Sequence, residues 1–201
     1  MSRLLIVPLA FALALAVAPA APVPKDRQDN FSFPTRAGTK WVYRLTIGKE
    51  EKSLTYVAKS AEATVDGRKA VWISLDDPKW ASGGTMEVSE KGVFEQVAFP
   101  GGAILRPPVC LLQLPHRDGN KWETKTTVLD MIRTETRTAH GPELVEVPGG
   151  KYKAIRVESE YAHDGGKARK QTQWYASGIG LVKWVVRDEV WVLTAFHPAK
   201  E

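Results

Sequence analysis

Residues 155–161 read Ile-Arg-Val-Glu-Ser-Glu-Tyr, so that apolar or small side chains alternate with charged ones. Residues 132–138 alternate in the same way. Their charged members are Arg133, Glu135 and Arg137. A period of two predicts a β-strand with one face toward the core and the other toward water, as in an antiparallel sheet. We therefore expect these three charged side chains to lie on the solvent face.

Turn signals separate the alternating runs at intervals of about 8–12 residues, which is typical of an all-β meander. Candidate turns lie at Pro148-Gly149, Asp164-Gly165-Gly166 and Arg187-Asp188-Glu189. Because proline presets φ, the first of these predicts a type II turn with Gly149 at positive φ. No stretch after residue 20 has the pattern of an amphipathic helix. Segment 105–114 contains Pro107 and Pro108, which forbid more than one helical turn, and we expect a crossover there.

One motif occurs twice in the chain. Residues 33–41, Phe-Pro-Thr-Arg-Ala-Gly-Thr-Lys-Trp, recur at 114–122 as Leu-Pro-His-Arg-Asp-Gly-Asn-Lys-Trp. Five of the nine positions are identical, which indicates internal duplication. The expected fold class is all-β. We predict an antiparallel meander of two pseudo-repeats of about 80 residues, 31–112 and 113–201, which form a strongly curved sheet, a half-barrel or a barrel.

The N-terminus has the pattern of a secretory signal peptide. Arg3 precedes an apolar run from Leu4 to Val17, and Ala18-Pro19-Ala20 offers small residues for cleavage. A transmembrane anchor is the alternative, but the run of about 14 residues is short of the roughly 20 that span a bilayer. We expect a signal peptide at 1–20, a single β domain at 21–201, and an exported protein, periplasmic or extracellular, without a stable membrane anchor.

The overall charge and the single cysteine limit the possible functions. The formal net charge is only +5, and the basic residues are scattered rather than clustered, which argues against nucleic-acid binding. Cys110 is the only cysteine, so no disulfide can form within the chain. Its neighbours are apolar, and we expect a buried structural thiol rather than a nucleophile or an intermolecular bridge.

The sequence offers no catalytic, cofactor or metal site. The four histidines, each beside turn residues, are expected in surface loops: His116, His140, His163 and His197. None lies within five residues of another, so local zinc spacing is absent. No Gly-x-Ser-x-Gly motif occurs, and the glycine pairs lack the strand-to-helix context of phosphate loops. We therefore expect a protein that is not an enzyme.

The seven tryptophans are the remaining candidates for function. Trp41 and Trp122 each open a strand after an apolar-Pro turn, so we expect both in the core. Trp72 lies on the strand face opposite Val71 and its apolar partners, while Trp80 lies in a loop. Exposed aromatic residues favour binding, so Trp72 and Trp80 form the candidate binding surface.

Three segments together resemble a group of uncharacterised exported bacterial β proteins, including the TapB-like families. They are Phe33-Pro34-x3-Gly38-x2-Trp41-x-Tyr43, Val145-x-Val147-Pro148-x-Gly150-x-Tyr152-x-Ala154 and Trp174-Tyr175-Ala176-x-Gly178-Ile179-Gly180-Leu181-Val182-Lys183. The resemblance implies a curved antiparallel sheet, similar to the half-barrels of lipoprotein carriers. It brings no catalytic residues, because the shared motifs are turns, glycines and aromatic residues.

These observations predict an exported, non-enzymatic binding or structural module whose partner is a protein or an apolar ligand. The alternative is a carrier or sensor that holds an apolar ligand in the groove of a half-barrel. A hydrolase is the third possibility. A deep apolar groove would favour the carrier, and convergent polar residues in a cleft would favour an enzyme.

Overall fold

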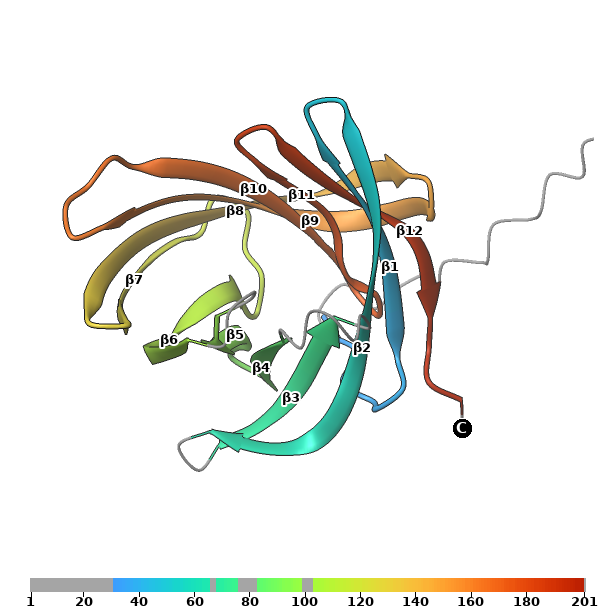
Figure 1. Ribbon diagram of the computed structural model, residues 1–201, viewed down its shortest axis with the longest axis horizontal. Helices are drawn as coiled ribbons and strands as arrows, with labels where there is room; N and C mark the ends of the chain where they lie inside the picture. Colours follow the sequence, from blue (N-terminus) through green and yellow to red (C-terminus); the bar gives the residue numbers. More distant parts are fainter. Residues whose placement is uncertain (1–30, 66–67, 76–82, 99–102, 201) are drawn as a thin grey trace, which may run out of the picture.

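The computed structural model describes residues 31–65, 68–75, 83–98 and 103–200, which form an antiparallel barrel (Figure 1). The expected signal peptide and Trp80 lie outside these residues. The strands are β1 (Lys40–Ile47), β2 (Glu50–Val65), β3 (Arg68–Leu75), β4 (Gly83–Ser89), β5 (Gly92–Val97), β6 (Ile104–Gln113), β7 (Lys121–Val128), β8 (Met131–Val147), β9 (Gly150–His163), β10 (Arg169–Ala176), β11 (Gly180–Val186) and β12 (Glu189–His197).

The barrel is closed by its first and last strands. Each strand pairs with its neighbours in sequence, and β1 also pairs with β12 from Lys40↔His197 to Ile47↔Glu189. The predicted all-β antiparallel meander is confirmed. We expected a strongly curved sheet, a half-barrel or a barrel, and the sheet is a closed barrel. The half-barrel is wrong, because β1 and β12 are hydrogen-bonded to each other. Among the described residues, no helix is long and apolar enough to cross a bilayer.

The two copies of the repeated motif adopt the same turn. Gly38 donates its amide to the carbonyl of Ala58 at 2.7 Å, and Gly119 donates to Ala139 at 2.8 Å. Both glycines have positive φ, +89° and +74°, a conformation that costs glycine little. The next residue in each copy, Thr39 or Asn120, continues the same pattern of backbone bonds. The first motif therefore leads into β1 and the second into β7, so that each precedes a series of six strands. Duplication of the complete halves stays a prediction.

The segment expected to be a crossover is a strand. β6 runs from Ile104 to Gln113 through both prolines, whose φ suits extended backbone although neither has an amide to donate. The ladder is interrupted accordingly. β6 pairs with β7 only at Arg106↔Thr127, and its register with β5 shifts between Ile104 and Val109.

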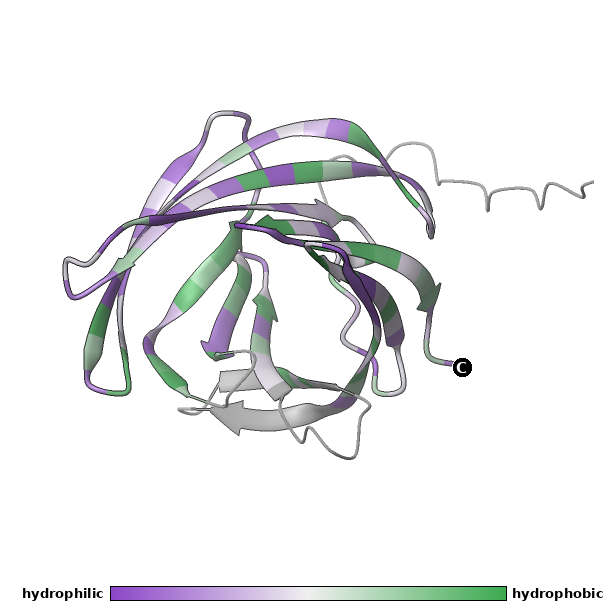
Figure 2. Ribbon diagram, turned by 45° about the horizontal axis from the view of Figure 1, so that its top comes forward, coloured by the Kyte–Doolittle hydropathy of each residue, from purple (hydrophilic) through white to green (hydrophobic). Residues whose placement is uncertain are grey.

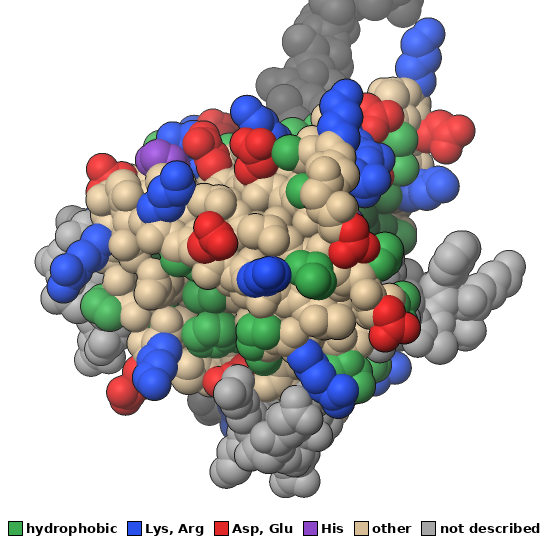
Figure 3. Space-filling view, turned by 90° about the vertical axis from the view of Figure 1, so that its left-hand side faces the viewer, with side chains coloured by type: hydrophobic (Ala, Val, Ile, Leu, Met, Phe, Trp, Pro, Cys, Tyr) green, Lys and Arg blue, Asp and Glu red, His purple; other side chains and the backbone are tan. Residues whose placement is uncertain are grey.

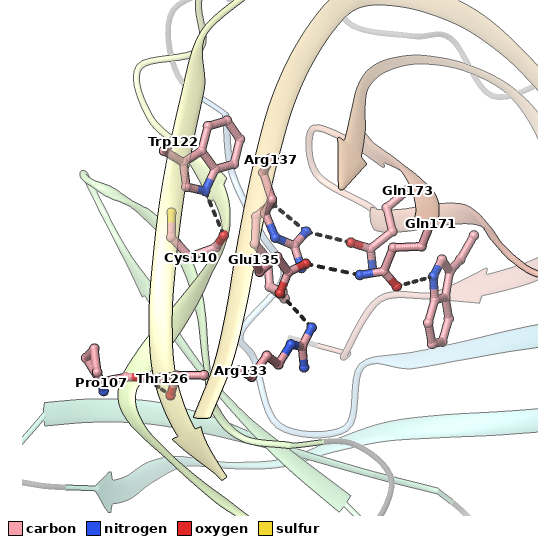
Figure 4. Close-up of polar contacts among 11 residues, drawn as sticks. Pro107, Cys110, Trp122, Thr126, Arg133, Glu135, Arg137, Gln171 and Gln173 are labelled. Atoms are coloured by element: carbon pink, nitrogen blue, oxygen red, sulfur yellow. Dashed lines mark hydrogen bonds and ion pairs between the residues drawn. The ribbon is translucent and has the colours of Figure 1, made fainter. Parts of the chain in front are cut away.

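Side chains replace the missing backbone bonds between β6 and β7. The Trp122 indole donates to the carbonyl of Cys110 at 2.9 Å, and the Thr126 hydroxyl donates to Pro107 at 2.6 Å (Figure 4). Trp122 is partly buried and packs against the core, so the expectation of a core residue is met only in part for Trp122. It is right for Trp41, which is 2% exposed and donates to the carbonyl of Ile179.

One side of the barrel interior is filled by aromatic side chains. Tyr43 packs edge-on against Tyr56 at a centroid distance of 5.7 Å, and Trp191 lies 6.3 Å from Tyr56. Trp184 stacks on Trp191 at 5.5 Å. These contacts join β1, β2, β11 and β12 across the closure of the barrel.

The expected orientation of β8 is inverted. Glu135 and Arg137 are 0% and 1% exposed, whereas Ile132 on the opposite face is 43% exposed. Figure 2 shows hydrophilic and hydrophobic residues alternating along the long strands. Alternation gives β8 two faces, but the charged face is the one that lies inside the barrel. The neighbouring β9 has the expected orientation, with Val157 buried.

The turn between β8 and β9 also differs from the prediction. Positive φ occurs at Gly150 and not at Gly149, so this is not the expected type II turn. Gly149 instead donates its amide to the carbonyl of Leu193 in β12 at 2.9 Å. A Cβ on Gly149 would lie only 2.9 Å from that same oxygen, so glycine is required here for close packing.

Candidate functional site

A buried ionic cluster lies inside the barrel and is built from β8 and β10 (Figure 4). Both oxygens of Glu135 are paired, one with Arg133 at 2.6 Å and the other with Arg137 at 2.7 Å. Gln173 accepts from Arg137 at 2.9 Å, and Gln171 donates to Glu135 at 3.3 Å. β9 lies between β8 and β10, and its small Ser159 pairs with Arg137 on one side and with Gln171 on the other, so the longer side chains of β8 and β10 meet over it.

The cluster has an excess of positive charge. Two guanidinium groups share one carboxylate, and the exposed fractions of the Arg133, Glu135 and Arg137 side chains are 14%, 0% and 2%. The Nε atoms of both arginines are buried without a hydrogen-bond partner. Because a buried charge is costly unless it is compensated, this end of the interior favours a further anion.

A pocket of about 720 Å³ opens at the end of the barrel nearest Arg133. It lies between the β9–β10 loop and the β11–β12 turn. Its basic lining residues are Lys167, Arg169, Lys170 and Arg187, together with His163, and no acidic residue lines it. Of the four lysines and arginines, only Lys170 is ion-paired within the described chain, at 3.8 Å from Glu160.

Gln171 connects the pocket to the buried cluster. It lines the pocket, donates to Glu135, and accepts from the Trp184 indole at 2.9 Å. Arg133 pairs across the sheet with His163, which also lines the pocket. The cluster is therefore joined to the pocket wall through Gln171, while the basic β9–β10 loop supplies most of the cationic lining.

The electrostatics of His163 reflect this positive environment. Burial lowers the pKa of His163, and the charges of Arg133 and Arg169 lower it further. Asp164 and Glu135 act in the opposite direction and do not cancel the effect. The imidazole packs edge-on against Tyr161 at 6.0 Å, and the Arg133 guanidinium lies 4.6 Å from the centre of the same Tyr161 ring. An anion placed here would meet several positive charges at short range.

The residues singled out in the sequence lie elsewhere. Trp72 is half-buried in β3, between the buried Val71 and Ile73, and therefore points to the opposite face of the sheet. Nothing in the structure tests it as a binding residue. Of the histidines expected in loops, His140 lies within β8, and His163 and His197 end their strands. Only His116 lies in a connection between strands.

Cys110 is free and partly buried in β6. Burial raises the pKa of its thiol to about 11, and the nearby Arg137 offsets only part of that rise. The thiol therefore stays protonated at neutral pH, which suits the structural role expected for it. Among the described residues, no group of three or more His, Cys, Asp or Glu side chains is arranged to hold a metal ion.

Sequence reasoning missed the site because its charged residues have the same alternation as a solvent-facing strand. A second signal was present in Gln171 and Gln173, which occupy alternate positions in β10 and so share one face of the strand. Two glutamines on an inward face suit a buried acid–base cluster. This signal gains meaning only once β8, β9 and β10 are known to be neighbours in one barrel.

The fold and the pocket together define a closed, twelve-stranded, up-and-down barrel with a basic site at one end. Residues 118–188 match the family described as DUF3108-like. This match covers β7 to β11 completely, including the buried cluster and the β9–β10 loop.

Two solved structures are similar to this chain. A candidate lipoprotein from Parabacteroides distasonis is 14% identical, with a TM-score of 0.53 over 85% of this chain and 100% of that chain. A candidate exported protein with a YmcC-like fold from Bacteroides fragilis is 14% identical, with a TM-score of 0.48 over 83% of this chain and 99% of that chain. At this identity, the first likeness concerns the fold alone. No curated protein matches the sequence.

Proposed function

We propose that this protein is an exported, non-enzymatic binding protein whose ligand carries an anionic group, such as a phosphate or carboxylate. The observation that carries the proposal is the excess positive charge of the Arg133–Glu135–Arg137 cluster beside the basic pocket. Lys167, Arg169 and Arg187 have no ion pair within the described chain, so they are available to a ligand. Charge-assisted hydrogen bonds from arginine to oxyanions are among the stronger polar contacts in proteins.

Export is supported by the N-terminal sequence, which has the charged start, apolar run and small-residue cleavage site of a signal peptide. The fold is also that of a candidate lipoprotein. A binding role without catalysis is supported by the high pKa of Cys110, which disfavours a thiolate nucleophile. The basic lining of the pocket suits an anion better than the wholly apolar ligand of a carrier.

The test is a titration with inorganic phosphate, using the chain without residues 1–20. His163 ring signals are followed by NMR, and the melting temperature is measured in parallel. We expect saturable shifts of the His163 signals, a rise in the His163 pKa as the anion binds, and thermal stabilisation. Arg169→Gln and Arg187→Gln should each weaken binding by about ten- to a hundredfold, since a lost charge-assisted bond is worth about 1.5–3 kcal/mol.

Lys151→Gln is the matched control, because Lys151 lies on the hairpin at the opposite end of the barrel and is 63% exposed. It should bind phosphate as the unaltered chain does. Equal weakening by Lys151→Gln would show that binding follows net charge and not the pocket, and the proposal would then fail. Native mass spectrometry of protein purified from its own envelope would identify the physiological ligand.

A further inference from the structure

Hydrophobic side chains exposed at one end of the barrel form an apolar tip, which we define as Ile104, Leu129, Met131 and Ile132. Their exposed fractions are 46%, 73%, 42% and 43%. These are four of the five large hydrophobic side chains that the described chain exposes, so they are concentrated rather than scattered. Three lie in or beside the β7–β8 turn, and the pairing of Arg106 with Thr127 places Ile104 beside that turn.

Folding does not explain the leucine at this turn. Leu129 and Asp130 have φ angles of +46° and +65°. Two positive φ values define a hairpin turn that favours Asn-Gly, because a larger side chain is strained in that region. Leu129 is therefore both strained and exposed, and a contact outside the chain would account for its presence.

Basic residues lie around the apolar tip. Arg106 and Lys125 are exposed on the flanking strands, and neither is ion-paired within the described chain. The basic β9–β10 loop is fixed next to the tip by two hydrogen bonds. The Asp164 carboxylate accepts from the amide of Ile132 at 2.8 Å, and the Asp164 amide donates to the carbonyl of Ile132 at 2.8 Å.

Figure 3 looks onto the side of the molecule that lies at the left of Figure 1, where a few hydrophobic side chains lie together among Lys, Arg, Asp and Glu side chains. Apolar side chains on a projecting turn with cations around them suit the interface of an anionic bilayer. The apolar groups enter the acyl boundary and the cations meet the headgroups. Four side chains on a narrow turn are a small area beside the 20–30 residues that each partner contributes to a standard protein interface.

We propose that the apolar tip docks this protein reversibly on an anionic lipid surface. The occupant is the bilayer itself, recognised by its acidic headgroups and hydrocarbon boundary. The tip has the β9–β10 loop as a neighbour in common with the pocket, but none of its four apolar residues lines the pocket, so a change at Leu129 tests this proposal without altering the pocket lining.

The test is flotation of the chain without residues 1–20 with vesicles of phosphatidylcholine alone or mixed with phosphatidylglycerol. We expect binding to the mixed vesicles that weakens at high salt. Leu129→Ser should reduce the partition coefficient about tenfold, the amount expected when one buried leucine is lost. The charge variant Lys125→Glu should weaken binding to mixed vesicles and leave binding to phosphatidylcholine unchanged.

Leu144→Ser is the matched control, since Leu144 is 74% exposed but lies on the β8–β9 hairpin at the opposite end. It should bind vesicles as the unaltered chain does. Equal loss in the two serine variants, or no vesicle binding at all, would overturn the proposal. Self-association that disappears in Leu129→Ser, without vesicle binding, would assign the tip to a second copy and would equally overturn it. Phosphate binding by the pocket would be unaffected by any of these results.

Discussion

At the scale of the residue, the most consequential side chain is Glu135. It is 0% exposed, and its two oxygens pair with the two arginines that flank it on the inner face of β8. Removing one partner of a buried ionic cluster costs far more free energy than replacing the whole cluster by apolar residues, because the remaining buried charges lose their compensation. The stability of the barrel at this end therefore depends on one carboxylate.

We expect Glu135→Gln to lower the free energy of unfolding by about 3–5 kcal/mol, because two guanidinium groups would stay buried without a negative charge. Urea denaturation measures this loss. Glu146→Gln is the control: its carboxylate is 70% exposed and 3.1 Å from Lys151, so less than about 1 kcal/mol should be lost. Equal losses in the two variants would mean that Glu135 is not buried with its partners.

A second prediction at this scale concerns the pH dependence of Cys110. Burial raises the pKa of its thiol to about 11 from an ordinary value of 9.0. The folded protein favours the protonated thiol, so this preference contributes fully to the free energy of unfolding below pH 9, the pKa of the thiol in the unfolded chain. The contribution is lost as the pH rises from about 9 to about 11. We expect slow modification by thiol reagents at pH 8 and a large acceleration in urea. Fast modification of the folded protein would contradict this picture.

At the scale of the element, the β6–β7 junction is the weakest ladder among the described strands, with one residue pair. Pro107 and Pro108 supply no amides, and side-chain donors on β7 and β8 take over. Besides Trp122 and Thr126, Arg137 donates to the carbonyl of Leu111 at 3.4 Å. The junction is thus coupled to the ionic cluster through Arg137.

Thr126→Val should destabilise the protein by about 1–3 kcal/mol, because the carbonyl of Pro107 would lose its donor. Hydrogen exchange should rise mainly in β6 and β7. Thr127→Val provides a neighbouring control, since Thr127 is exposed and forms no such bond. Uniform acceleration of exchange over the whole barrel would argue against a local junction.

The β8–β9 hairpin is held against β12 by close backbone packing at Gly149. We expect Gly149→Ala to release the hairpin, because the added Cβ would lie 2.9 Å from the carbonyl oxygen of Leu193. NMR shifts should therefore change around Leu193. Gly165→Ala is the control that distinguishes a steric clash from backbone strain. A Cβ on Gly165 would have no atom within 4 Å, but its φ of +70° would be strained for alanine. It should lower stability without altering the signals of β12.

At the scale of the whole molecule, closure between β1 and β12 removes the exposed edges that an open sheet would present. The closing ladder joins residues at opposite ends of the chain, and the Thr194 hydroxyl adds a bond to the carbonyl of Val42 at 3.0 Å. Because contacts this distant in sequence form only when the whole meander is in place, the barrel should fold as one unit.

Deletion of residues 189–201 should therefore prevent folding, since β1 and β11 would each lose a partner strand. Near-ultraviolet circular dichroism, which reports the packed aromatic side chains, should lose its signal. Removal of residues 198–201 alone leaves β12 complete and should preserve the signal. A folded protein after the larger deletion would show that closure is dispensable.

The sequence by itself determined the type of secondary structure, the positions of several turns and the burial of individual residues such as Trp41. Alternation and turn residues predicted an antiparallel all-β meander, and the position of Trp41 predicted a buried residue. These features depend on side-chain periodicity and backbone preference within a few residues. The repeated turn around Gly38 and Gly119 belongs to the same class, because its hydrogen bonds begin from a nine-residue motif.

Only the tertiary structure decided which face of each strand lies inside, how the sheet closes and which loops meet. Both faces of β8 carry polar residues, so its orientation depends on partners such as Gln171 and Gln173, which lie more than thirty residues away. Closure depends on the pairing of β1 with β12, which no local pattern encodes. The pocket and the apolar tip exist for the same reason, since each is assembled from turns that become neighbours only when the barrel has formed.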